Sequence, residues 1–209
     1  MQFGGFQPFT LSDYPGHIAA IAFAQGCNFR CPFCHNGDLL AFTPCEKSLY
    51  PESEIIRTLR RRQGKLEGLV VSGGEPTLQD NLPRFLERVK GLGYKIKLDT
   101  NGSRPDMLSW LFAARLVDYI AMDIKAPLAR YSRLSGVVVD VDAIEESIAL
   151  IAWSKLPHHF RTTAVTPLLN EADMRAVAQL VPPGSELVVQ PFNPENALEP
   201  SLRNDAAIA

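Results

Sequence analysis

Short apolar runs alternate with helix-like patterns along most of this chain. The first run, 18–24, lies between Pro15-Gly16 and Gln25-Gly26, as expected of a buried strand. Similar runs predict five more strands, at 66–71, 94–98, 119–122, 160–165 and 187–190. Apolar residues at three- and four-residue spacing predict helices between the strands, at 52–63, 82–89, 107–111, 142–151 and 171–180.

Strands that alternate with helices predict right-handed crossovers and a parallel sheet. Six such units predict a single α/β domain over 1–209. A partial (β/α)6 TIM-like barrel and an open doubly wound sheet are the two candidate architectures, and the spacing, together with the resemblance described below, favours the barrel. A turn signal at 12–16 predicts that residues 1–17 form a hairpin or cap. Residues 193–209, which include Pro194 and Pro200, are expected to form a loosely ordered tail.

A CxxxCxxC loop, formed by Cys27, Cys31 and Cys34, follows the first predicted strand. Three thiolates on one short loop can hold a soft metal centre. Structural zinc sites normally have four protein ligands, and iron–sulfur clusters commonly have four cysteines. Three cysteines therefore leave one metal position open, which suggests that a substrate or cofactor completes the coordination.

Other uses of these cysteines are open at this point. Cys45 or His35 could close a structural zinc site, although His35 directly follows Cys34 and would reach the same ion only with strain. Cys45, in a polar stretch, fits a spare thiol better. A disulfide framework is disfavoured because four cysteines in 209 residues are far from the density of small secreted scaffolds.

Polar residues follow the other predicted strands as well. The carboxyl ends of parallel strands meet at one edge of a sheet, where ligands bind. Glu75 could instead be a surface turn acid, and Asp123 with Lys125 could be a structural ion pair. The residues expected at this edge, beside the cysteines, are Gly73, Gly74, Glu75, Asp99, Thr100, Asn101, Asp123, Lys125, Arg161, Thr162, Thr163 and Gln190.

Composition excludes several classes of protein. Hydrophobic residues make up 46% of the chain, which is typical of a globular domain. The net charge of −2 argues against a nucleic-acid partner, and no apolar run approaches the roughly 18 residues of a membrane span. The N-terminus lacks the basic and apolar regions of a signal peptide, so the free thiols predict a cytoplasmic protein.

The cysteine loop resembles the cluster-binding loop of the radical S-adenosylmethionine (SAM) enzymes, with Phe33 as the aromatic residue before the last cysteine. The longer string 25–36, QGCNFRCPFCHN, resembles the activating enzymes of glycyl-radical enzymes, most closely those of anaerobic ribonucleoside-triphosphate reductase. The segment 11–16, LSDYPG, fits the same subgroup. The resemblance extends from about residue 5 to 192 and supports the partial barrel.

The resemblance implies a site. Cys27, Cys31 and Cys34 would ligate a [4Fe–4S] cluster whose remaining iron binds SAM. The segment Gly73-Gly74-Glu75 would contact the SAM amino group. Some relatives hold a monovalent cation with the two aspartates and a main-chain carbonyl. Some also have histidine where this chain has Asn193, which leaves the role of that position open. The cofactor-binding residues implied in this way are Phe33, Gly73, Gly74, Glu75, Asp99, Thr100, Asp123, Lys125 and Arg161.

The implied reaction is reductive cleavage of SAM to methionine and a 5′-deoxyadenosyl radical. That radical would take hydrogen from a glycine of anaerobic ribonucleotide reductase, with a flavodoxin- or ferredoxin-type protein as reductant. The chain is short and lacks the cysteine-rich insert of some activating enzymes. Two alternatives stay open: a radical SAM enzyme for a small molecule such as a pterin-like ring, and a non-catalytic module stabilised by metal.

Overall fold

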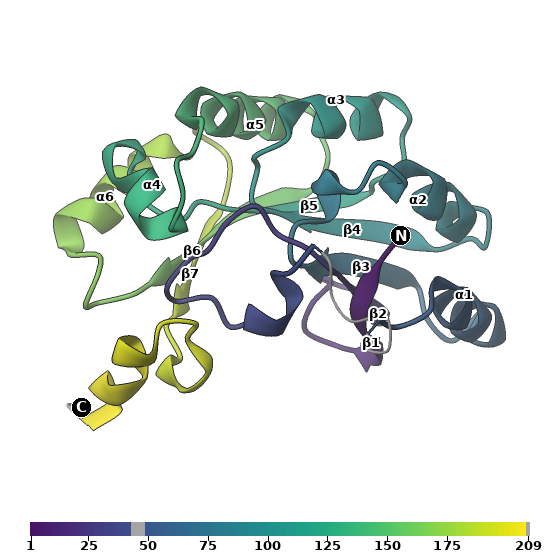
Figure 1. The fold of residues 1–209 in the computed structure, drawn as a ribbon. Coiled ribbons are helices and arrows are strands. Elements are labelled where there is room, and N and C mark those ends of the chain that lie inside the picture. The colour runs from purple at the N-terminus through teal and green to yellow at the C-terminus, as the bar shows by residue number, and fades with distance from the viewer. Residues whose placement is uncertain (43–48, 208–209) are drawn as a thin grey trace.

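One curved sheet, whose strands lie side by side in the order of the chain, is the centre of the structure (Figure 1). This computed structural model describes residues 1–42 and 49–207, so Cys45 lies outside the described part. The strands are β1 (Phe3–Thr10), β2 (Ala19–Ala24), β3 (Gly68–Gly73), β4 (Lys95–Thr100), β5 (Tyr119–Asp123), β6 (His158–Ala164) and β7 (Leu187–Pro191).

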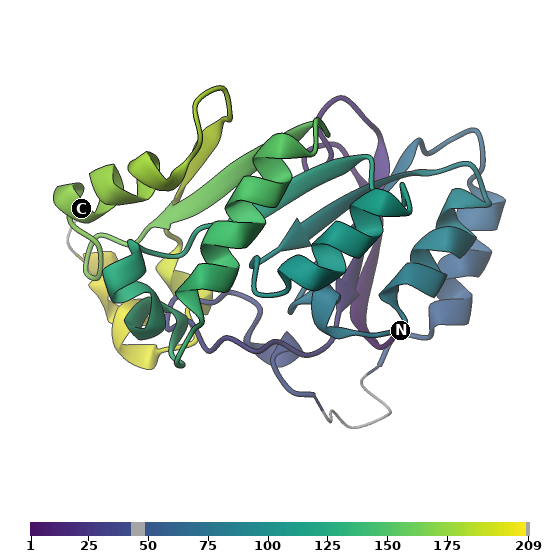
Figure 2. The same cartoon turned by 90° about the horizontal axis from the view of Figure 1, so that it is seen from above.

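Helices connect the parallel strands and lie along one face of the sheet (Figure 2). They are α1 (Glu52–Arg61), α2 (Leu82–Lys90), α3 (Pro105–Ala113), α4 (Tyr131–Ser135), α5 (Val141–Trp153) and α6 (Glu171–Leu180). The cysteine loop and the C-terminal segment lie on the other side of the sheet (Figure 1). Short 3-10 helices are η1 (Gly37–Leu39), η3 (Pro76–Leu78), η4 (Leu128–Arg130), η5 (Pro194–Asn196) and η6 (Pro200–Ala207).

The strand order distinguishes between the two predicted architectures. Strands β2 to β7 are parallel to their neighbours, and β1 pairs antiparallel with β2. A doubly wound sheet would reverse its strand order at a switch point. The order β1 to β7 contains no reversal, and in the described part of the chain β1 and β7 do not pair. The prediction of a partial, open barrel with six parallel strands is confirmed.

Successive side chains of a strand point to opposite faces of the sheet, one toward the helices and one into the barrel. On β4, Ile96 and Leu98 belong to the large apolar core beneath the helices, whereas Lys97 and Asp99 point to the concave side. On β2, Ala20 and Ala22 belong to the same large core, whereas Ile21 belongs to a smaller cluster inside the barrel. The concave side therefore carries a small apolar cluster and, apart from it, charged groups. These charged groups belong to the site described below.

The loop after β1 closes the amino-terminal end of the barrel. Tyr14 is 2% exposed and packs with Ile21 and Val70, while its ring lies edge-on to Tyr119. A Cβ added to Gly68, the first residue of β3, would lie 2.7 Å from the Tyr14 ring, so the two segments are in close contact. We call this cluster the barrel floor. Residues 1–17 thus contain the antiparallel partner of β2 and a plug.

The C-terminal segment is better ordered than its prolines suggested. Two 3-10 helices, η5 and η6, follow β7, and Ala197 and Leu202 are buried. The Glu199 N–H donates a 2.8 Å hydrogen bond to the Pro32 carbonyl. The expectation of a loosely ordered tail is wrong for 193–203, because these contacts fasten the segment to the cysteine loop.

Candidate functional site

A cavity of about 420 Å³ opens at the carboxyl ends of the parallel strands. It brings together most of the residues that the sequence places at this edge. Those that line it are Cys27, Cys31, Cys34, Phe33, Gly73, Gly74, Asp99, Thr100, Asn101, Asp123, Lys125, Arg161, Thr163 and Gln190. Glu75 and Thr162 do not line it, and Asn193 contacts it only through a neighbour, because its carbonyl accepts a 2.7 Å hydrogen bond from His35.

The cysteine loop is held by backbone contacts from three directions. The Gly26 N–H donates to the Leu39 carbonyl at 2.7 Å, and the Arg30 N–H donates to the Ser135 carbonyl at the end of α4, also at 2.7 Å. On the third side Pro32 accepts from the C-terminal segment. A Cβ on Gly136 would lie 2.8 Å from the Arg30 carbonyl carbon, so α4 approaches this loop closely.

The three thiols face one cavity and have the environment of metal ligands. Cys27 and Cys31 are buried, and Cys34 is half-buried. Burial is the largest influence and raises the pKa of Cys27 to about 12 and that of Cys31 to about 11. A buried thiol ionises when a metal cation coordinates it and displaces the proton. The donor set and its burial therefore fit a thiolate-bound metal centre.

The arrangement fits a cluster better than a single zinc ion. Ligands of one zinc ion lie about 2.0–2.3 Å from the metal and so converge on a point. Among the described residues, no three His, Cys, Asp or Glu side chains converge closely enough to hold one ion. In an iron–sulfur cluster the cysteines bind different irons, so their sulfur atoms stay apart. The fourth zinc ligand considered above, Cys45, lies outside the described residues.

Gly73 and Gly74 bring backbone to the cavity wall. Gly73 ends β3 with φ +112°, in the region that L side chains rarely adopt. A Cβ on Gly74 would lie 2.7 Å from the Gly26 carbonyl carbon, next to Cys27. The close approach of these two backbones requires glycine. It leaves peptide groups, without side chains, at the edge of the cavity.

Glu75 is a buried support for the site and does not face the cavity. Its side chain is 1% exposed and accepts hydrogen bonds from Thr77, from the Thr100 hydroxyl at 2.8 Å and from the Asn101 N–H at 2.6 Å. Burial raises the pKa of Glu75, and these donors oppose that rise. The carboxylate thus ties the end of β3 to the end of β4. The alternative of a surface turn acid is wrong, because the side chain is buried. Contact of the segment Gly73-Gly74-Glu75 with SAM stays a prediction.

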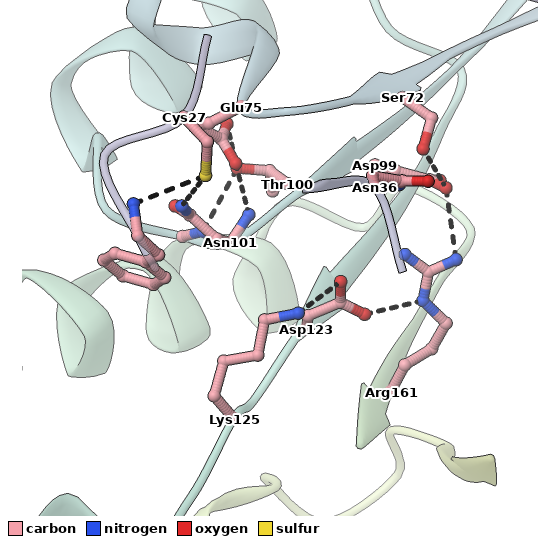
Figure 3. Close-up of polar contacts among 12 residues, drawn as sticks. Cys27, Asn36, Ser72, Glu75, Asp99, Thr100, Asn101, Asp123, Lys125 and Arg161 are labelled. Carbon is pink, nitrogen blue, oxygen red and sulfur yellow. Dashed lines mark hydrogen bonds and ion pairs between the residues drawn. The ribbon is translucent and has the colours of Figure 1, made fainter. Parts of the chain in front are cut away.

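A charged network crosses the concave side of strands β4, β5 and β6 (Figure 3). Arg161 bridges two aspartates: its Nε lies 2.8 Å from Asp123 Oδ1, and its Nη1 lies 3.1 Å from Asp99 Oδ2. Lys125 Nζ lies 3.0 Å from Asp123 Oδ2, and Lys97 pairs with Asp99. The predicted Asp123–Lys125 ion pair is present as one part of this larger network.

The network places an excess of positive charge beside the thiols. Three cationic side chains face two carboxylates, which leaves one net positive charge. Burial is the largest influence and opposes ionisation of each carboxyl, but Arg161 together with Lys97 at Asp99, and with Lys125 at Asp123, outweighs it and lowers the pKa of both aspartates. Both aspartates are therefore ionised at neutral pH. The cavity wall is suited to an anionic ligand group such as a carboxylate.

Sequence reasoning missed four contributors. Lys97, which is 2% exposed, belongs to the network, and Ser72 donates to Asp99 at 3.1 Å. Asn28 accepts a hydrogen bond from the Asn101 amide at 2.9 Å, which links the cysteine loop to the end of β4. Tyr131 of α4 is fully buried behind Lys125. The signal for Lys97 was available, because it lies two residues before Asp99 on the same strand and so faces the same side of the sheet.

Comparison with known proteins identifies the family. Residues 21–181 match the Radical SAM superfamily. A Methanocaldococcus jannaschii protein, MJ1227, which is named provisionally as a glycyl-radical enzyme activating enzyme, is 31% identical over 204 residues. That match covers 95% of this chain and 83% of MJ1227. The pyruvate formate-lyase-activating enzyme of Listeria monocytogenes is 36% identical over 121 residues, 54% of this chain and 48% of that enzyme.

Solved structures agree with the fold. Streptococcus suis SuiB bound to S-adenosylmethionine matches with a TM-score of 0.63 and 14% identity. The match covers 83% of this chain but only 40% of SuiB. Within 1–42 and 49–207, no helix combines the length and apolar composition needed to cross a membrane. The superfamily match covers most of this chain, and the match to MJ1227 covers 95% of it. This protein therefore belongs to the radical SAM superfamily.

Proposed function

We propose that this protein activates a glycyl-radical enzyme, and specifically an anaerobic ribonucleotide reductase, by hydrogen abstraction from a glycine Cα. Membership of the superfamily implies a [4Fe–4S] cluster and SAM as its cofactors. The observation that carries the proposal is the shared cavity: three cysteines of one loop, glycine backbone, and the cationic side chains of Lys125 and Arg161 surround one space of about 420 Å³. The similarity to MJ1227 supports an activating enzyme.

The cysteines and the strand ends divide the work of holding the cofactors. Cys27, Cys31 and Cys34 would hold the cluster. Lys125 would attract the SAM carboxylate, and the peptide groups of Gly73 and Gly74 would accept its amino group. When bound, the cluster would supply one electron for cleavage of the SAM sulfonium, and SAM would supply the group that accepts the hydrogen atom. The chain's own residues bind, orient and shield these groups.

Apolar side chains on the cavity wall exclude water from the reacting centre. Phe29, Phe33 and Leu40 line the cavity, and each is less than 8% exposed. Exclusion of water protects a reactive species from side reactions. The cavity would stay open at the strand ends, where a glycine-bearing loop of a partner protein could enter. Glycine has no side chain, so such a loop needs no side-chain pocket. A flavodoxin- or ferredoxin-type protein is the proposed reductant, and the cytoplasm, where thiols stay reduced, is the proposed compartment.

A small-molecule substrate is the second candidate. The observation that favours it is the pair of cationic side chains that line the cavity, Lys125 and Arg161, which would attract a small anionic substrate as well as the SAM carboxylate. The two candidates differ in where the hydrogen atom comes from. A protein radical supports the first, and hydrogen transfer from a small anion supports the second.

Cluster content tests the cofactor assignment. Anaerobic reconstitution should load about four irons and four sulfides per chain. Replacement of Cys31 by Ser should abolish iron uptake, whereas Cys45→Ser, outside the three-cysteine set, should leave it unchanged. Tight zinc binding without iron uptake would contradict the assignment.

Electron paramagnetic resonance tests the activity itself. Reduced enzyme, SAM and an anaerobic ribonucleotide reductase should produce a stable glycyl radical with stoichiometric methionine and 5′-deoxyadenosine. A reductase variant with the target glycine replaced by alanine is the control and should give no radical. SAM cleavage with no protein radical on any glycyl-radical reductase would exclude the first candidate and favour the second.

A further inference from the structure

The two aspartates at the ends of β4 and β5 already have protein partners on every carboxylate oxygen. Asp99 Oδ1 pairs with Lys97, and Asp99 Oδ2 lies 3.1 Å from Arg161 Nη1. Asp123 Oδ1 lies 2.8 Å from Arg161 Nε, and Asp123 Oδ2 lies 3.0 Å from Lys125 Nζ. The guanidinium therefore occupies the space between the carboxylates, where an ion shared by both would have to lie (Figure 3).

Charge in the surroundings also disfavours a further cation. Three cationic side chains already exceed the two carboxylates by one. His159 faces the same interior from β6. Burial is the main cause that lowers the pKa of His159; Lys97 and Arg161 lower it further, and Asp99 and Asp123 raise it. The loss of hydration that disfavours a proton on this buried imidazole would also disfavour an added sodium or potassium ion.

The residues present thus do not fit the monovalent cation that the resemblance implied. A cation site requires oxygen ligands with a net negative charge around them. Here every carboxylate oxygen has a cationic partner, and the network of these five side chains carries one net positive charge.

The geometry points to Arg161 as a built-in counter-ion that takes the place of a monovalent cation. It holds Asp99 and Asp123 in position, and Asp123 in turn positions Lys125 toward the cavity. Arg161 is then a positioning residue for the SAM site of the proposed function. The inference predicts that this enzyme, unlike relatives that bind such an ion, works independently of sodium and potassium.

Cation substitution at constant ionic strength tests the inference. Tetramethylammonium chloride, which is too large for the site, is compared with sodium and potassium chloride. The melting temperature of the purified protein, which needs neither SAM nor cluster, should agree within about 1 °C in the three salts. SAM affinity of the reconstituted enzyme, measured by equilibrium dialysis, should agree within about twofold. Potassium or sodium dependence of the wild-type protein in either measurement would overturn the inference.

Arg161→Ala provides the converse test. Without the guanidinium the two carboxylates face an empty space, and potassium or sodium should now raise SAM affinity by about tenfold or more over tetramethylammonium. Arg161→Lys keeps the charge and should stay cation-independent. Arg130→Ala, which removes an ion-paired arginine outside the cavity, is the matched control. Absence of cation dependence in a folded Arg161→Ala protein would overturn the inference.

These experiments separate the inference from the proposed function. Failure of the wild-type enzyme to bind SAM in any salt would contradict the proposed cofactor. The melting temperatures would still show whether a cation stabilises the site. Normal SAM binding with strong potassium dependence would contradict only the role of Arg161.

Discussion

His159 shows how the barrel interior affects a single residue. It lies on the concave side of β6, is 8% exposed, and its Nδ1 lies 2.8 Å from the Tyr119 hydroxyl. Burial, with a further contribution from Lys97 and Arg161, lowers the pKa of His159 to about 4 from 6.5. The folded protein therefore keeps this imidazole neutral at a pH where the unfolded chain protonates it.

Stability should consequently fall as the pH decreases through this range. Below about pH 6.5 the unfolded state binds one more proton than the folded state, so the free energy of unfolding decreases until the pH reaches about 4. Between pH 7 and pH 5 the loss from this group should be about 1–2 kcal/mol.

Urea unfolding at the two pH values measures this loss of stability. His159→Gln, whose amide can still bond to Tyr119, should remove that loss, whereas the partly exposed His17→Gln should retain it. An unchanged loss in His159→Gln would contradict the prediction.

The residue scale also shows which site positions sequence reasoning can find. Cys27, Asp99, Asp123 and Lys125 follow apolar runs, and their type and place predict a shared edge, which the structure confirms as one cavity. The sequence could not show that Glu75 is buried, because a turn acid and a buried acid look alike until its partners, Thr77 and Asn101, are placed. The binding of SAM by the residues that line the cavity stays a prediction.

At the scale of elements, the end of β3 sets the position of the cysteine loop. Gly73 and Gly74 allow β3 to approach the backbone that follows β2, and the Glu75 N–H donates a 2.8 Å hydrogen bond to the Gly26 carbonyl. The cysteine loop begins at the next residue, Cys27. A displacement of this junction would therefore move Cys27, the first of the three proposed cluster ligands.

Gly74→Ala should disturb both stability and cluster loading. The added methyl would overlap the Gly26 carbonyl, and such overpacking typically costs about 1–3 kcal/mol. Iron content after reconstitution should fall below that of the wild type. Gly5→Ala is the matched control, because its Cβ would lie at an ordinary 3.5 Å from Phe23. Normal stability and full iron content in Gly74→Ala would show that the junction tolerates a side chain.

Element boundaries show where periodicity is informative. The limits of α6 (Glu171–Leu180) agree with the prediction, because a long apolar repeat and a capping asparagine, Asn170, define it. The short helix α4 was not predicted, since five residues are too few for a helical repeat. Order in the C-terminal segment was also missed. It depends on two buried side chains, Ala197 and Leu202, that carry no local signal.

At the scale of the whole molecule, the barrel has two cores that stabilise different parts. The large core holds the helices against the sheet, and the barrel floor fills the amino-terminal end of the open barrel. Only a few side chains make up the floor, and Tyr14 is the largest of those that are fully buried. Its loss would leave a cavity that the curved sheet cannot easily close.

Tyr14→Ala should therefore be costly although Tyr14 lies outside the functional site. Truncation of a buried aromatic ring typically costs about 3–5 kcal/mol. Tyr14→Phe keeps the ring and should lie within about 1 kcal/mol of the wild type. Denaturant unfolding of the two variants checks the difference. Similar stabilities of Tyr14→Ala and Tyr14→Phe would mean that the floor does not depend on this ring.

The contact between the C-terminal segment and the cysteine loop has a consequence for the order of assembly during synthesis. One of the three anchors of the loop comes from Glu199, which is translated long after Cys34. A nascent chain that ends before residue 193 would have its cysteines attached on two sides only, so they should react faster with iodoacetamide than those of the full chain. Equal alkylation rates in the two chains would contradict this expectation. Metal insertion into the finished enclosure is then a late event, after nearly the whole chain has emerged.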